Sequence, residues 1–186
     1  MSRLPELKPE EMTPEQKEIY QSIVSGPRGS VPAPLTVWLR RPELCRHAQA
    51  LGSYCRYDTA LPPRLSELAI MLMGRHWLAE YEWATHKPHA LAAGLSEDVL
   101  NAVRDGREPQ FANRDEAVLY AFFTRLHAER KVDDALYAEA VELLGEDGVI
   151  DLIGIVGYYT LISTTIQAFE LSATYCKGPK EMPESL

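Results

Sequence analysis

The chain has 186 residues, which is the length of one domain and is enough to bury a substantial hydrophobic core without disulfides or metals. Its formal net charge of −8 and its pI near 5.2 argue against a nucleic-acid-binding protein, which needs a concentrated basic surface. The opening stretch MSRLPELKPEEM lacks the uninterrupted apolar core of a signal peptide, so we expect a cytoplasmic protein.

The first predicted helix begins after Thr13 and ends near Ser25. Thr13 can cap it, Pro14 suits the first helical position, and Gln16 completes a capping box. The GPRGSVPAP stretch that follows cannot continue a helix because of its Gly and Pro content, so we expect an extended surface loop. Within this loop the planar guanidinium of Arg28 could bind a substrate carboxylate, but we favour a solvated turn residue.

A short helix or apolar arm is expected at residues 35–39, and Pro42 opens a longer helix that ends near Tyr57. We expect the polar-tipped side chains of this longer helix to be exposed or half-buried. Its apolar stripe is predicted at Leu44, Ala48, Leu51 and Cys55.

The stretch LPPRLSELAIMLMGRHWLAEYEWATHKPHALAAG, residues 61–94, predicts a helical hairpin. Pro62 and Pro63 suit a helix start, and a break within residues 74–78, which include Gly74, would start a second helix near Ala79. Without that break Glu67 and Glu82 would lie roughly 22 Å apart, too far to cooperate. The apolar stripe of the first helix is predicted at Leu65, Leu68, Ala69, Leu72 and Met73.

Glu67, Glu82 and His86 form a candidate acid–base set on this hairpin. Glu82 and His86 are four residues apart, so they share one helix face. Glu80 and Glu82 fall in the first turn, where the helix dipole keeps a carboxylate ionised. His86 is the better proton donor or acceptor, because its intrinsic pKa is near neutrality. We expect Glu67 to fix the tautomer of His86 and to raise its pKa.

Further helices are expected after Gly94 and Asp133. Ser96 can cap a helix through Arg104 that Gly106 closes. Asp133 or Asp134 can cap a further helix through Leu144, which should end at Gly145. Between them, Asn113 and Glu116 resemble a capping box that precedes the apolar residues Val118, Leu119, Phe122, Phe123 and Leu126.

The segment 148–174 is apolar enough to raise the question of a membrane span. Asp151 and several Thr and Ser residues interrupt it, so we expect a central buried or interface helix and no membrane association. No stretch shows the alternation that strands need. The sequence therefore predicts one all-α domain over residues 1–186, with about seven helices around a central helical hairpin.

The order Glu67, Glu82 and His86, set within YEWATH and followed by the AxxxGL run at residues 90–95, resembles the carboxymuconolactone decarboxylase-like family of the alkylhydroperoxidase D-like superfamily. The resemblance is densest over residues 43–130, after an N-terminal helix and loop at residues 1–42. It extends to GPRG at residues 26–29, GREP at residues 106–109 and GYYTLIS at residues 157–163.

The alkylhydroperoxidase D motif is a Glu, then a CxxC pair, then a His. On that spacing the Glu matches Glu67 and the His matches His86, but Ala79 and Glu82 occupy the two cysteine positions. The thiol pair is therefore missing, and the chain looks like the decarboxylase-like branch. The resemblance implies a compact helical protein that assembles as a homo-oligomer, a trimer or a hexamer, and acts on a small molecule without a metal or an organic cofactor.

For this branch the resemblance implies a lyase that decarboxylates a small carboxylated lactone or a related intermediate of aromatic-compound degradation. His86 would deliver the proton, while Arg75, His76 or His89 would hold carboxylate or enolate oxygens. Tyr81 and Trp83 would wall the pocket, although core packing is an equal alternative for both aromatic residues.

Two other classes remain open. A peroxidase would need a reactive thiol near His86, for which only Cys55 is a candidate; the three cysteines show no CxxC or metal spacing and are expected to be reduced packing residues. A metal-binding or non-catalytic oligomer would use Glu82 and His86 with Glu67 or His89, or would keep the Glu–His contacts only to join two helices.

Overall fold

The structure, a computed structural model, describes residues 2–5, 7–176 and 178–185. These residues form helices and connecting loops and contain no strand, which confirms the all-α prediction. The elements are η1 (Pro9–Glu11), α1 (Pro14–Val24), α2 (Ala33–Trp38), α3 (Pro42–Tyr57), α4 (Pro63–His76), α5 (Glu80–Ala92), α6 (Glu97–Arg104), α7 (Arg114–Glu129), α8 (Asp134–Phe169) and α9 (Ser172–Tyr175).

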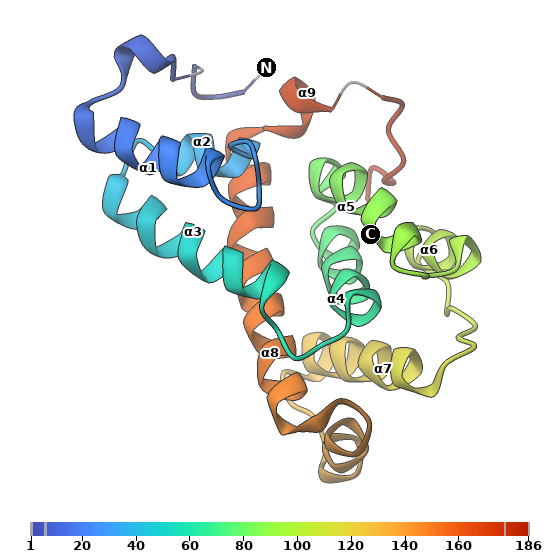
Figure 1. The fold of residues 1–186 in the computed structure, drawn as a ribbon. Helices are drawn as coiled ribbons and strands as arrows, with labels where there is room; N and C mark the ends of the chain where they lie inside the picture. Colours follow the sequence, from blue (N-terminus) through green and yellow to red (C-terminus); the bar gives the residue numbers. More distant parts are fainter. Residues whose placement is uncertain (1, 6, 177, 186) are drawn as a thin grey trace.

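Helix α8 is the axis of the molecule. Figure 1 shows α1, α2 and α3 on one side of α8 and the α4–α5 hairpin on the other, with α7 beside the first part of α8. Leu152, Ile155 and Ile166 of α8 are fully buried, and a single hydrophobic cluster joins α8 to the helices on both sides. Both halves of the fold therefore depend on packing against one helix.

By length and composition α8 could cross a membrane, but 61% of its most apolar window is buried inside the protein, as in the core helix of a soluble protein.

Gly145 interrupts α8 with φ 76° and ψ 163°, so the helix end predicted there is present as a sharp bend. The predicted span 148–174 is wrong at its end. The helix stops at Phe169, where Glu170 adopts a left-handed conformation.

The predicted stripe of α3 is also wrong in part. Leu44 and Leu51 are 46% and 47% exposed, whereas Cys45, Ala48, Gly52 and Cys55 are buried. The face of α3 that is buried is the one that packs against Tyr158 of α8. A Cβ atom at Gly52 would lie 2.0 Å from the Tyr158 hydroxyl oxygen, so only glycine allows this approach. Leucine patterning alone could not reveal which α3 face meets a tyrosine from a distant helix.

The hairpin forms as predicted, but its turn is built differently. Gly74 lies buried inside α4, and Leu78 takes the left-handed conformation at φ 50° that reverses the chain. The Ala79 N–H donates to the Gly74 carbonyl at 2.8 Å, which closes the end of α4. Helix α5 then begins at Glu80 and packs on α4.

Most predicted helix caps are present. Thr13 and Gln16 form a reciprocal capping box, Ser96 caps α6, and Asp133 caps α8. The box predicted at Asn113 is wrong, because Glu116 does not reach back to the backbone. Its carboxylate instead accepts hydrogen bonds from the side chains of Asn113 and Arg64.

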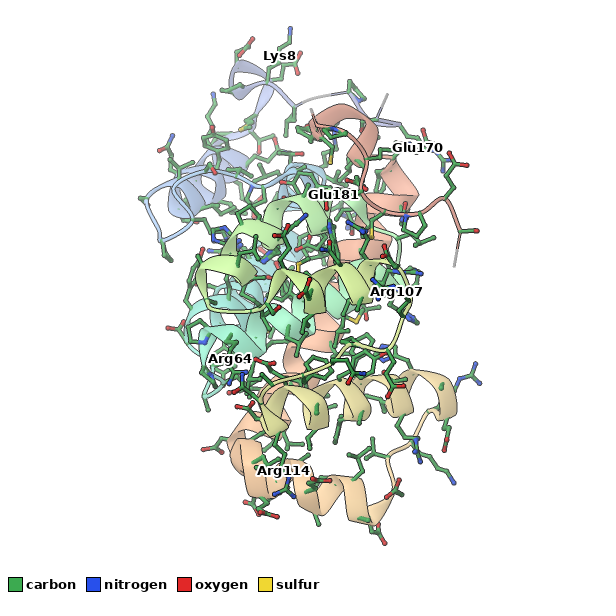
Figure 2. The ribbon with its side chains drawn as sticks, turned by 90° about the vertical axis from the view of Figure 1, so that its right-hand side faces the viewer. Lys8, Arg64, Arg107, Arg114, Glu170 and Glu181 are labelled. Atoms are coloured by element: carbon green, nitrogen blue, oxygen red, sulfur yellow. The ribbon has the colours of Figure 1, made fainter. Side chains whose placement is uncertain are left out.

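The C-terminal segment 178–185 is held on α5. The buried carboxylate of Glu80 accepts hydrogen bonds from the backbone N–H groups of Glu181 and Met182 at 3.0 and 2.8 Å. Glu181 in turn forms an ion pair with Lys87 at 2.6 Å. Figure 2 shows Glu181 beside the green helices, and its contacts with Glu80 and Lys87 attach this segment to α5.

Candidate active site

Glu67, Glu82 and His86 come together where α4 and α5 pack. Nδ1 of His86 lies 2.8 Å from Glu67 Oε2, and Nε2 lies 2.9 Å from Glu82 Oε1. Helical spacing places Glu82 one turn before His86, while the reversal at Leu78 brings Glu67 of α4 to the other edge of the ring. The imidazole is therefore held between two carboxylates.

This arrangement favours a charged imidazole. Burial by itself lowers the pKa of His86, but the carboxylates of Glu82 and Glu67 outweigh it and raise the pKa from 6.5 to about 8. His86 is only 2% exposed, so water does not screen these contacts effectively. Because both ring nitrogens face carboxylate oxygens, an imidazolium that donates from both positions satisfies the geometry.

Tyr159 completes the surroundings of His86 from α8. Its hydroxyl oxygen lies 3.5 Å from His86 Nε2, at the outer limit of a hydrogen bond, and the two ring centroids are 5.4 Å apart. Burial raises the pKa of Tyr159 well above its ordinary value, so the hydroxyl stays neutral and can donate a hydrogen bond.

These four side chains line a cavity of about 510 Å³, a size that suits a small ring compound. The wall comes from the loop after α1, from α2 and the end of α3, and from α4, α5 and α8. Tyr81 and His89, which the sequence analysis predicted to contact a substrate, also line this cavity. The Tyr81 hydroxyl accepts a hydrogen bond from the Ala33 N–H at 3.1 Å, whereas His89 is exposed at the cavity edge.

Arg75, His76 and Trp83 do not line this cavity, which corrects their predicted position. Arg75 and His76 line a separate cavity of about 210 Å³ with residues of α6 and α7. At roughly 100° per residue, they point about 80° and 180° away from Glu67 around α4. Trp83, one residue beyond Glu82, is 1% exposed in the core, and its Nε1–H donates to Glu181 at 3.3 Å.

An aromatic cluster of His76, Phe123 and His127 lies beside the second cavity. The rings of His76 and His127 have centroids 4.5 Å apart, and burial together with the neighbouring His127 lowers the pKa of His76. The Arg75 Nε–H donates to the Arg104 carbonyl at 2.8 Å. These contacts place Arg75 and His76 at the junction of α4, α6 and α7.

Several cavity residues were not predicted as site residues. Arg28, for which we favoured a solvated turn, is half-buried and lines the cavity. Arg56 and Tyr57 contribute from the end of α3, and Tyr158 and Tyr159 contribute from α8. The signals were present in the GPRG and GYYTLIS stretches, but only the fold brings those stretches to the hairpin.

No cysteine lines the cavity within the part of the chain that the structure describes. Cys45 and Cys55 are buried, and burial raises the pKa of each thiol from 9.0 to about 11. Cys176 is half-buried beside a different cavity. In the same described ranges, no group of three or more His, Cys, Asp or Glu side chains is arranged to hold a metal ion.

No protein-family model matches the chain, and no curated protein matches it. Among solved structures, a Cys-to-Ala variant of the debrominase Bmp8 in complex with 2,3,4-tribromopyrrole is similar with a TM-score of 0.70 and 15% identity, over 91% of this chain and 92% of that one. An uncharacterized peroxidase-related protein from Silicibacter sp. TM1040 is similar with a TM-score of 0.71 and 13% identity, over 90% of this chain and 88% of that one. At such identities the likeness shows the fold, which is the helical alkylhydroperoxidase D-like fold.

Proposed function

We propose that this chain is an enzyme that decarboxylates a small unsaturated ring compound by acid–base chemistry, without a metal or an organic cofactor. The observation that carries the proposal is the imidazole of His86 held between Glu67 and Glu82 at the wall of a cavity. A buried imidazole with a raised pKa and two charged partners is typical of proton-transfer sites.

Each member of this set has a distinct role. Glu67 accepts the Nδ1 hydrogen and fixes the orientation of the ring. Nε2 of His86 is directed at Glu82, whose carboxylate lines the cavity. The proton therefore reaches the substrate through the Glu82 carboxyl group, and His86 supplies it. In this respect the proposal differs from the simpler expectation that His86 protonates the substrate directly.

The chemistry balances with these groups alone. The bond to the substrate carboxylate breaks and releases CO2, while the electron pair moves through the conjugated ring into a carbonyl oxygen. As the electrons return, the ring carbon takes one proton from the Glu82–His86 pair, and solvent replaces that proton afterwards. The neutral Tyr159 hydroxyl stabilises the negative oxygen by donating a hydrogen bond.

Turnover of carboxymuconolactone and of related carboxylated lactones tests the proposal. We expect His86→Asn and Glu82→Gln each to lower kcat by about 100-fold or more, because each removes proton transfer in the transition state. His47→Asn removes an exposed histidine on α3 and should retain the wild-type rate. Equal rates for His86→Asn and the wild type would remove the imidazole from the reaction.

The likeness to a peroxidase-related protein supports a hydroperoxide-reducing alternative at the level of fold. That chemistry needs a thiolate beside the acid–base set, and Cys55 is fully buried with a raised thiol pKa. Reduction of cumene hydroperoxide by the wild type, lost in Cys55→Ser or Cys176→Ser, would favour this alternative over decarboxylation.

A further inference from the structure

Three hydrogen-bond donors at the cavity have no acceptor. Nε and Nη2 of Arg28 and the hydroxyl of Tyr158 are all buried, and each lacks a hydrogen-bond partner in the described structure. A buried polar group without a partner destabilises the folded protein, and a charged group does so more strongly. A site that keeps three such donors free is prepared for an acceptor that the chain does not supply.

The donors of Arg28 and Tyr158 converge on one point of α3. A Cβ atom at Gly52 would lie 2.0 Å from the Tyr158 hydroxyl oxygen and 2.8 Å from Nη2 of Arg28. The bare Cα of Gly52 therefore makes the room in which the hydroxyl and the guanidinium approach each other. These groups come from α8 and from the loop after α1, which are far apart in the sequence.

The local charge at this place is positive. The Arg28 and Arg56 guanidinium carbons lie 5.9 and 5.6 Å from the centre of the Tyr57 ring, so two cations share one aromatic residue. Arg64, by contrast with Arg28, has acidic partners: its partly buried guanidinium forms ion pairs with Asp115 and Glu116.

The acidic residues of the cavity are already engaged. Glu67 and Glu82 bind His86 through short contacts at 2.8 and 2.9 Å, so neither is free to neutralise Arg28. The cavity thus has an acid–base part on the hairpin and a cationic part at the GPRG loop. Apolar side chains that suit a ring, those of Pro34, Leu35 and Ile162, line the same space.

We propose that Arg28 and Tyr158 form a carboxylate-binding subsite for a planar ring carboxylate. The guanidinium donates from Nε and Nη2 to the carboxylate oxygens, a geometry that its planar fork suits, and the Tyr158 hydroxyl donates a third hydrogen bond. A dianionic phosphate fits less well, since Glu67 and Glu82 in the same cavity repel a second charge. That the bound carboxylate belongs to the substrate rests on the proposed function; the anion site itself does not.

Calorimetric binding of benzoate, with benzamide as its uncharged isostere, tests this subsite in the full-length protein. We expect the wild type to bind benzoate at least about 10-fold more tightly than benzamide, because only the anion satisfies the buried guanidinium. Arg28→Gln should weaken benzoate binding by about 10- to 100-fold and leave benzamide binding unchanged. Tyr158→Phe should weaken benzoate binding by about 3- to 10-fold, as expected for one neutral donor.

Arg56→Gln is the matched control, since it removes the same charge from the same cavity and from the same Tyr57 ring. Its loss of benzoate affinity should stay below about 3-fold, because a long-range charge contributes less than a direct hydrogen bond. Arg28→Lys keeps the charge but loses the planar guanidinium, so its benzoate affinity should lie between those of the wild type and Arg28→Gln. This variant keeps the test valid if Arg28→Gln fails to fold.

Equal losses in Arg28→Gln and Arg56→Gln would overturn the subsite and leave only a diffuse positive field. No benzoate binding tighter than ~10 mM in the wild type would overturn it as well. Displacement of benzoate by inorganic phosphate at lower concentration would replace the carboxylate with a phosphate ligand. Because binding is measured without turnover, these outcomes are independent of the His86→Asn result that tests the reaction.

Discussion

His86 owes its charge to having two carboxylate neighbours. Without Glu82 the Nε2 atom would face only the Tyr159 hydroxyl at 3.5 Å, and the burial cost would favour the neutral ring. With Glu67 at Nδ1 and Glu82 at Nε2, both carboxylates receive an N–H hydrogen bond only when the ring is protonated. The contacts on which the proposed proton transfer depends therefore also contribute to stability below the pKa of His86.

The stability of the protein should depend on pH through His86. Its pKa is about 8 in the folded chain and 6.5 ordinarily, so the folded state binds the proton more tightly. This contribution is complete below the unfolded pKa and is lost as pH rises through the folded pKa. Urea denaturation should show the free energy of unfolding of the wild type, relative to His86→Gln, falling by on the order of 2 kcal/mol between about pH 6 and about pH 9.5. Other titrating groups cancel in this difference, and a flat difference would contradict the raised pKa.

Residues set by local spacing were predictable. The Glu82–His86 pair follows from the helical repeat, and Glu67 joins it once the chain is allowed to reverse before Ala79. For Arg28 the sequence allowed a substrate contact but favoured a solvated turn, because its surroundings come from α3 and α8, which local patterning does not connect to the loop. Arg75 and His76 show the reverse error: they are near in sequence but lie on other faces of α4.

At the scale of helices, the contact of α3 with α8 depends on a missing side chain. Gly52 to Ala would ordinarily stabilise a helix by about 0.5–1 kcal/mol. At this position the new methyl group would meet the Tyr158 hydroxyl, which must move out of its packed place. Only the structure could reveal this contact, since the sequence LGSYC predicts an ordinary helix in which the glycine lowers helix stability.

Two glycine substitutions test this packing as a pair. Gly52→Ala should lower the free energy of unfolding by about 1–3 kcal/mol, as overpacking does. Gly157→Ala, on an exposed position of α8 where an added Cβ meets nothing within 4 Å, should raise it by about 0.5–1 kcal/mol. Urea denaturation of both variants gives the comparison. A Gly52→Ala variant that is stabilised like Gly157→Ala would mean that α3 and α8 are more loosely packed than the structure indicates.

At the scale of the whole molecule, the C-terminal segment is bound to the helix that carries Glu82 and His86. Glu80 holds the backbone of Glu181 and Met182 from the first turn of α5. Glu80→Ala should therefore free this segment and lower the free energy of unfolding by about 1–2 kcal/mol. Hydrogen exchange should show faster exchange for residues 178–185, while Glu97→Ala, at an exposed position of α6, leaves their exchange unchanged. Slow exchange in the Glu80→Ala protein would assign the binding of the segment to its other contacts.

The predicted homo-oligomer remains a proposal, for which the surface of the chain gives some support. Exposed apolar side chains lie on α3 at Leu44 and Leu51 and on α8 at Ile150, Ile153 and Leu161. These two helices pack together, and exposed apolar side chains on neighbouring helices are the kind of surface that a partner covers. The all-α class and the helix order could be read from the sequence because they depend on local periodicity. The faces that helices bury could not, since they depend on contacts between distant segments.

The central place of α8 also bears on how the protein is made. Helices α2, α3 and α4 leave the ribosome well before residues 134–169, yet the faces that they pack against α8 stay uncovered until α8 arrives. Partners so distant along the chain make assembly slow and leave nascent helices open to aggregation. The native fold is therefore completed only after α8 has been synthesised. A chain truncated before residue 134 would be prone to aggregate and would not form a smaller domain.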